Sequence, residues 1–383
     1  MSEAPEVHGI CDARFAAVRE ALRANFAERG EVGAAVAVTL DGRSVVDLWG
    51  GFADAARTHT WQRDTLVNVF SVGKGLAALC VHMLVDRGAL DLDATVARYW
   101  PEFAAQGKER VSVRELLAHR AGLPAIRQEL PPLAMYGWDR MAASLAQEEP
   151  WWEPGSAHGY HVNTFGYLLG ELVRRVTGTT LAAFFRREVA ERLGADFHFG
   201  IGAEHDARIA DCLLHSGPLR FSDPDPAREL LLNRTYANPQ GMSGNGTVNT
   251  RAWRAAEIPS TNAHGNARAV AAIYTPLACG GRAGSVMLLS DAAIREATRE
   301  AAFGPDVVLQ RATRMGLGYQ LTFEGRPLGP NPRSFGHFGA GGSLGIADPD
   351  ARLAFGYTLN QPGPRWNNPR TRALLDAVYA SLG

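Results

Sequence analysis

The sequence contains very little lysine. Lys plus Arg total 39 residues, and only Lys74 and Lys108 are lysines, so arginine carries nearly all the positive charge. The formal net charge is −1 and there is no run of basic residues, which argues against nucleic acid as a partner. No apolar stretch approaches the ~18 residues that a membrane helix needs, so we expect no membrane partner either.

Cysteine is scarce too, and no C-x-x-C pair is present. The four cysteines are Cys11, Cys80, Cys212 and Cys279. Their wide spacing predicts reduced, structural thiols. The segment Met1–Val7 has neither a basic start nor an apolar core, which favours a cytoplasmic location. His158 and His161 form the closest histidine pair but have no third ligand nearby, so we predict no metal site.

Apolar periodicity predicts an α+β fold. Helical spacing occurs over residues 12–28, 72–88, 111–124, 165–178, 179–192, 263–278, 290–301 and 368–382. Strand patterns occur over residues 32–40, 44–50, 315–323, 334–338, 343–347 and 353–359. Residues 125–157 are expected to be irregular, and residues 195–250 to form loops and short helices. The order predicts an antiparallel sheet built from both chain ends and flanked by helices, plus an all-helical domain. We place the discontinuous sheet domain at 1–92 and 255–383, and the helical domain with site loops at 93–254.

A Ser-x-x-Lys motif stands at the start of the helix predicted after residue 71. The motif is Ser71-Val72-Gly73-Lys74, and its spacing puts a hydroxyl and an amine one turn apart on one helix face. An amine whose pKa is lowered can accept a proton from a serine, whereas arginine stays protonated. In a chain that otherwise uses arginine, this lysine suggests a chemical need. Chance remains the alternative, because the motif alone is short.

A tyrosine precedes the helix that is predicted from residue 165. Tyr160 lies on the turn before it, and a phenol beside a lysine ammonium would have a lowered pKa and act as a base. A buried packing role is the alternative for Tyr160. Asn163 is more simply interpreted as the N-cap of that helix.

Small residues crowd the region between two C-terminal strands, from Phe335 to Gly345. Glycine at Gly339 lets a ligand approach the backbone closely. A backbone N–H near Gly339 or Ala340 is a candidate partner for that of Ser71 in an oxyanion hole. His337 is a candidate for binding polar groups of the substrate, or alternatively a structural histidine.

The same region contains a second serine motif. Gly341-Gly342-Ser343-Leu344-Gly345 matches G-x-S-x-G, which requires a strand–turn–helix arrangement when it carries a nucleophile. Here antiparallel strands flank the motif and no helical pattern follows, so Ser343 is disfavoured as the nucleophile.

Together these stretches resemble the serine β-lactamase and penicillin-binding-protein superfamily, and most of all the class C-like (family VIII) carboxylesterases. The matching segments are Phe70–Gly75, Val113–Leu123, Pro154–His161 and Gly336–Gly339. The resemblance implies a β-lactamase-like fold with the site between two domains. It implies Ser71 as nucleophile, Lys74 as activating amine and Tyr160 as general base and acid. The N–H groups of Ser71 and Ala340 would form the oxyanion hole, and no cofactor is expected.

Two departures point to esters as the main substrates. Val162 stands where β-lactamases have asparagine, and His337 replaces the lysine of their third motif and is only partly charged near neutral pH. We therefore expect hydrolysis of small or short-chain carboxylic esters through an acyl-enzyme on Ser71, with weak β-lactam hydrolysis at most. The expected partner is a small-molecule ester, and the sequence leaves the oligomeric state open.

Three alternative functions remain: a β-lactamase or D-amino-acid-specific peptidase or amidase, an acyltransferase, and a catalytically silent domain that binds acyl ligands. For the substrate-binding surface we predict His337 and Gly339, together with an apolar rim around the acyl group. The rim candidates are Tyr136, Trp151, Trp152, Met242 and Phe338.

Overall fold

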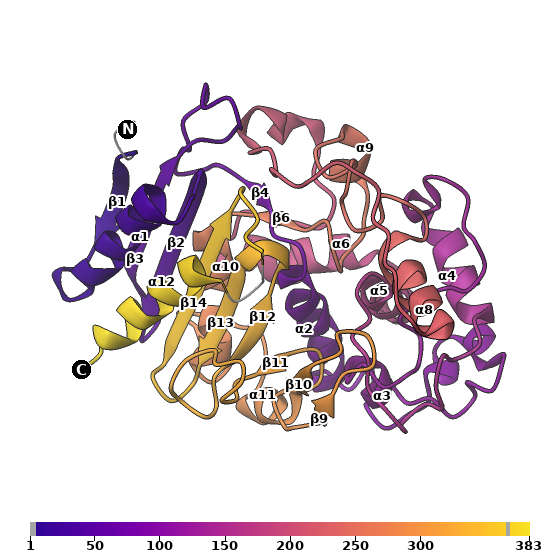
Figure 1. The fold of residues 1–383 in the computed structure, drawn as a ribbon. Coiled ribbons are helices and arrows are strands. Elements are labelled where there is room, and N and C mark those ends of the chain that lie inside the picture. Colours follow the sequence, from indigo (N-terminus) through magenta and orange to yellow (C-terminus); the bar gives the residue numbers. More distant parts are fainter. Residues whose placement is uncertain (1–4, 365–367) are drawn as a thin grey trace.

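A nine-stranded antiparallel sheet dominates the computed structural model, which describes residues 5–364 and 368–383 (Figure 1). The first four residues of the segment used to predict a cytoplasmic location fall outside this range. In spatial order the strands are β1 (Val7–Cys11), β3 (Arg43–Gly51), β2 (Gly33–Leu40), β14 (Leu353–Leu359), β13 (Leu344–Asp348), β12 (Phe335–Phe338), β11 (Gln320–Leu321), β10 (Ala312–Met315) and β9 (Ala302–Pro305).

The two ends of the chain meet inside this sheet, as the sequence predicts. β2 pairs with β14, so that Ala34 lies opposite Leu359. Edge strand β1 was not predicted, because Val7 is its only buried residue and it shows no apolar alternation. The strand expected over 315–323 is divided into β10 and β11, which a tight turn joins. The predicted α+β architecture, an antiparallel sheet built from both chain ends and flanked by helices, is confirmed.

Helices cover both faces of the sheet. α1 (Ala16–Glu28) and α12 (Pro369–Ala380) pack together on one face, over a core that includes Val38, Leu48 and Phe355. α10 (Ala267–Ala278) packs on the other face against β2, β13 and β14. A second, larger core continues from α10 into the helical part of the molecule on the right of Figure 1.

Helix α2 (Val72–Asp86) lies in the middle of the molecule, between the sheet and the helical part (Figure 1). The sequence predicts one apolar face, but every residue from Val72 to Leu84 is buried. α2 contacts β12 on one side and α5 (Thr164–Thr177) and α6 (Leu181–Phe185) on another. Gly75 permits the close packing, because a Cβ there would lie 2.6 Å from the hydroxyl of Tyr274. The fold thus fixes the start of α2 rigidly.

The helical part differs from the sequence prediction in three places. The helix predicted over 111–124 is shorter and comprises only α3 (Val113–Leu117). A capping box between Ser112 and Glu115 starts it. The helix ends before His119, which has a left-handed φ of 59°. The segment 125–157, expected to be irregular, contains α4 (Trp138–Gln147). The twelve-residue helix α8 (Pro226–Ala237) lies in the region expected to hold only short helices.

The remaining β-strands and α-helices are short. They are β4 (Val67–Asn68), β5 (Phe197–His198), β6 (His264–Gly265), β7 (Arg282–Ala283), β8 (Val286–Met287), α7 (Glu191–Leu193), α9 (Arg251–Ala255) and α11 (Asp291–Ala297). Among the helices of the described ranges, none has the length and apolar character needed to cross a bilayer. The division at residues 92 and 254 stays a prediction.

Candidate active site

The turn that leads into α2 presents Ser71 at the helix N-terminus. Phe70, just before it, has a left-handed φ of 48°, a conformation that costs a non-glycine residue about 1–2 kcal/mol. Ser71 takes the N-cap position but makes no side-chain cap hydrogen bond, and it is half-buried. Its hydroxyl is therefore not used in capping the helix.

Lys74 lies one turn along α2 and is completely buried. Its Nζ lies 2.9 Å from Ser71 Oγ and donates to the carbonyl of Ser260, also at 2.9 Å. Within the described residues no carboxylate forms an ion pair with Lys74, and burial holds the pKa of its amine well below the usual range. The neutral amine is thus favoured at rest.

Tyr160 faces this pair from the loop that precedes α5. The Lys74 Nζ lies 4.9 Å from the centre of its ring, and the nearby Ser71 side chain lowers the pKa of its hydroxyl slightly against the larger effect of burial. The hydroxyl is also 3.4 Å from His337 Nε2. The sequence-based expectation was a phenol with a lowered pKa, but burial raises the pKa of Tyr160 well above its usual range. Because burial disfavours the phenolate, the phenol is protonated at rest.

His337 completes the cluster from β12. It is fully buried, and its Nδ1 donates to the carbonyl of Phe338 at 2.8 Å, which leaves Nε2 as the acceptor facing Tyr160. Burial, with a smaller effect of nearby Lys74, lowers the pKa of His337 to about 3. The partial charge expected from the sequence is therefore absent near neutral pH, and His337 is a neutral acceptor.

The turn after β12 lies against the turn that carries Ser71. A Cβ at Gly339 would come within 2.3 Å of the Val69 carbonyl, so only glycine fits this approach. The N–H of Gly339 is occupied by the carbonyl of Ser343 at 2.7 Å. In the part of the chain that the structure describes, no backbone acceptor takes the N–H of Ser71 or of Ala340. These two amides remain the candidates for an oxyanion hole.

The residues predicted to form an apolar rim lie at different distances from the cluster of Ser71, Lys74 and Tyr160. Trp152 packs on Gly159 and meets the His161 ring edge-on at 6.0 Å, next to Tyr160. Phe338 instead packs in the core under α1 and α12, on the opposite face of β12 from His337. Consecutive strand residues point to opposite faces, so Phe338 does not extend toward Ser71.

Three further rim candidates contact other parts of the molecule. Met242 is buried in the larger core, and Tyr136 packs against that core. The Trp151 indole donates to the carbonyl of Ala125 at 3.0 Å. Their contact with substrate stays a prediction.

Ser343 has a structural role, in agreement with the sequence interpretation. It is buried between two antiparallel strands, and its Oγ donates to the Val69 carbonyl at 2.9 Å. Asn163 takes the N-cap position of α5 but does not cap it with its side chain, which donates to Thr235 and Ser243 instead.

The two histidines near Tyr160 are engaged with protein atoms. His158 Nε2 bonds with the Thr313 hydroxyl at 2.9 Å, and His161 bridges the carbonyl of Gly159 and the N–H of Leu123. No group of three potential metal ligands occurs among the described residues.

Sequence reasoning assigned no role to three residues that contact the cluster. Ser260 supplies the carbonyl for Lys74. His119 accepts the N–H of Gly159 on its carbonyl and that of His161 on its ring. Asp306 accepts the N–H of Tyr160. His119 belongs to a matched motif and could have been found, whereas neither Ser260 nor Asp306 lies in a recognisable pattern.

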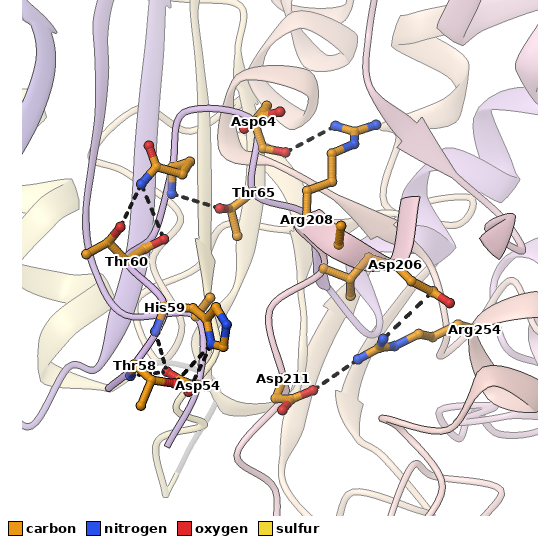
Figure 2. A pocket seen from close by; sticks show the side chains of 14 residues that line it. Asp54, Thr58, His59, Thr60, Asp64, Thr65, Asp206, Arg208, Asp211 and Arg254 are labelled. Atoms are coloured by element: carbon orange, nitrogen blue, oxygen red, sulfur yellow. Dashed lines mark hydrogen bonds and ion pairs between the residues drawn. The ribbon is translucent and has the colours of Figure 1, made fainter. Parts of the chain in front are cut away.

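A separate hollow of about 600 Å³ lies outside this cluster, between the segments 53–65 and 206–211 (Figure 2). Its arginines already have partners: Arg254 donates to Asp211, and Arg208 donates to the carbonyl of Asp64. None of Ser71, Lys74 and Tyr160 lines it. The hollow is therefore not the reaction site.

Comparison with known proteins agrees with this geometry. A family model described as Beta-lactamase matches residues 18–380. The chain belongs to the Beta-lactamase family. The family resemblance inferred from the motifs is thus confirmed.

Individual relatives of this family cover nearly the whole chain. "Esterase/beta-lactamase LipL" of Mycobacterium tuberculosis is 35% identical over 368 residues, 93% of this chain and 83% of its own. "Esterase EstB" of Burkholderia gladioli is 30% identical over 390 residues, covering 92% of each. A crystal structure of a family VIII carboxylesterase superposes with a TM-score of 0.91 at 42% identity, covering 98% of this chain and 100% of that one.

The phenol of Tyr160 can be tested alone, because phenylalanine keeps its ring. We expect Tyr160→Phe to lower kcat for a p-nitrophenyl ester by about 10²–10⁴-fold, the usual contribution of a positioned acid or base. The melting temperature serves as the control for folding. Wild-type kcat in this variant would remove Tyr160 from the proton path.

Proposed function

We propose that the protein is a serine carboxylesterase that hydrolyses small or short-chain carboxylic esters through an acyl-enzyme on Ser71. The observation that carries the proposal is the buried Lys74 amine, 2.9 Å from Ser71 Oγ and without a carboxylate partner among the described residues. A neutral amine at this distance can remove the serine proton directly. The names of the full-length relatives support the same chemistry.

Acylation follows from the resting protonation states. Lys74 Nζ takes the proton of Ser71 while Oγ attacks the ester carbonyl carbon. The negative charge that develops on the carbonyl oxygen is stabilised by the N–H groups of Ser71 and Ala340. The C–O bond to the alcohol then breaks, and Tyr160 gives its proton to the leaving oxygen. The Lys74 ammonium returns the proton to Tyr160 and restores the neutral pair.

Deacylation repeats these steps with water as the nucleophile. Lys74 takes a proton from water, directly or through Tyr160, and the hydroxide attacks the acyl carbon. The bond from Ser71 Oγ to the acyl carbon breaks, the Lys74 ammonium returns its proton to Oγ, and the carboxylic acid is released. The sum is ester plus water giving acid plus alcohol. His337, a neutral acceptor at the Tyr160 hydroxyl, orients the phenol during both halves.

The same proposal includes a small-molecule ester as the partner and a cytoplasmic location. The four cysteines are free thiols, which supports a reducing compartment.

β-Lactam hydrolysis is the second candidate, because one relative carries both activities in its name. The neutral state of His337 disfavours it, since a β-lactam carboxylate then loses a charged hydrogen bond worth about 1.5–3 kcal/mol. We expect kcat/KM for a chromogenic cephalosporin to be lower than for a short p-nitrophenyl ester by at least about 10–100-fold. Ser71→Ala gives the background rate for both assays. Comparable rates on the two substrates would contradict the esterase assignment.

A further inference from the structure

The carboxylate of Asp306 contacts the backbone of Tyr160. Asp306 follows β9 and is only 3% exposed. Both of its oxygens lie 3.1 Å from the Tyr160 nitrogen, whose N–H donates to them. The residue that carries the phenol is therefore held by a buried side chain from a distant part of the sequence.

The same carboxylate organises the hairpin from which it comes. Its Oδ1 accepts the N–H groups of Val308 at 2.9 Å and Leu309 at 2.8 Å, and its Oδ2 accepts the Thr313 hydroxyl at 3.3 Å. An ionised carboxylate offers acceptors only, which suits this set of donors. Asp306 thus joins the turn after β9 to the Tyr160 loop.

Two more hydrogen bonds run in parallel with this link. The Val307 N–H donates to the His158 carbonyl at 3.0 Å, and His158 Nε2 lies 2.9 Å from the Thr313 hydroxyl. On the other side of the loop, His119 holds the N–H groups of Gly159 and His161. The N–H of Tyr160 itself is held by Asp306, so the position of the phenol depends on that carboxylate.

We infer that Asp306 is a positioning residue for Tyr160, which acts through the Tyr160 backbone to hold the phenol hydroxyl against Ser71. The inference rests on the proposed function, in which that hydroxyl carries the proton to the leaving alcohol. A displacement of about 1 Å at a reacting group can cost about 10²-fold in rate. Loss of the hydrogen bond from the Tyr160 N–H to Asp306 should therefore have a measurable effect on kcat. The negative charge of Asp306 also adds to the rise in the pKa of Tyr160, which keeps the phenol protonated.

The test separates an effect on the position of Tyr160 from an effect on folding, because the rate is expressed per active site that the inhibitor labels. A phosphonate ester inhibitor that labels Ser71 gives the number of active sites, and kcat and KM for a p-nitrophenyl ester are then expressed per titrated site. We expect Asp306→Ser to lower kcat per site by about 10–100-fold and to change KM by less than about threefold. Serine keeps a short acceptor for the local turn but cannot span to Tyr160. Asp306→Asn keeps an amide oxygen of the right reach and should recover kcat to within about fivefold.

A double-mutant cycle with Tyr160→Phe decides the matter. If Asp306 acts through the phenol, Asp306→Ser costs less than about threefold in the Tyr160→Phe background. Equal losses in both backgrounds, or unchanged kcat per site in Asp306→Ser, would overturn the inference. If Asp306→Ser yields no protein that the inhibitor can label, Asp306→Asn takes its place. The smaller decrease in kcat that Asp306→Asn causes must then be absent in the Tyr160→Phe background. Thr313→Val, which removes a neighbouring contact of Asp306, is the matched control and should stay within about threefold. Failure of the esterase assignment would show separately, as absence of turnover in the unmutated protein.

Discussion

Ser71→Ala is expected to abolish turnover of a short p-nitrophenyl ester, with kcat falling by about 10⁴–10⁶-fold as for other serine nucleophiles. Removal of the hydroxyl deletes the atom that forms the acyl-enzyme. The half-buried side chain makes no helix-cap bond, and the hydrogen bond that Lys74 donates to it is worth about 1 kcal/mol, so the folded state should persist. Mass spectrometry after phosphonate treatment should find the label on the Ser71 peptide of the unmutated chain and no label on the variant.

Ser343→Ala is the matched control, because Ser343 lies in the more conspicuous serine motif. Its Oγ donates to the Val69 carbonyl, a hydrogen bond worth about 1 kcal/mol. We expect labelling at Ser71 to persist in this variant, with kcat within about tenfold of the unmutated value. Loss of labelling in Ser343→Ala together with retention in Ser71→Ala would reverse the assignment.

The second large effect is expected at Lys74. Lys74→Arg introduces a permanently charged guanidinium that cannot accept a proton, and Lys74→Met removes the nitrogen while keeping a similar volume. Both should lower kcat by at least about 10³-fold if the amine is the base that activates Ser71. Measurable turnover in Lys74→Arg would show that charge, not proton transfer, is what the site requires.

The buried amine also predicts how stability depends on pH. Burial lowers the pKa of Lys74 in the folded state, so between that pKa and the unfolded value of about 10.4 only the unfolded chain holds the proton. Raising the pH therefore favours the folded state. The free energy of unfolding should rise with pH about 1.4 kcal/mol per unit more steeply in the unmutated protein than in Lys74→Met. Urea titrations at pH 7.5 and 9 measure the difference, and equal slopes would mean that Lys74 is charged when folded.

Much of the site could be predicted because its chemistry restricts the residue types. The motifs that carry the family resemblance place a nucleophile, an amine and a phenol at Ser71, Lys74 and Tyr160, and the fold brings these three side chains together. Their protonation could not be read from the sequence, because it depends on how completely the surrounding core excludes water. The expected phenolate and ammonium are replaced by phenol and amine for that reason.

Asp306 and Ser260 were missed because each of their contacts with the cluster involves a backbone group, which every residue has. Asp306 contacts a backbone N–H, and Ser260 offers a carbonyl, so no side-chain pattern marks either of them. The error at Phe338 was avoidable, because neighbouring residues of one strand cannot both face Ser71. In the fold, strong periods gave β2, β3, β14 and α5 close to their observed bounds, whereas β1 and α8 lacked such periods.

The pairing of β2 with β14 also sets an order in time. Ribosomes add about 5–20 residues per second, and β14 lies about 320 residues after β2, so it emerges roughly 16–64 s later. Through that interval one edge of β2 has no partner, and α2 lacks the β12 strand that covers it. An unpaired strand edge and an apolar helix are what chaperones bind and what aggregates form from. The yield of folded protein should therefore be limited by aggregation before the last strands are synthesised. Truncation of the C-terminal quarter would leave Ser71 on a chain that cannot complete its sheet.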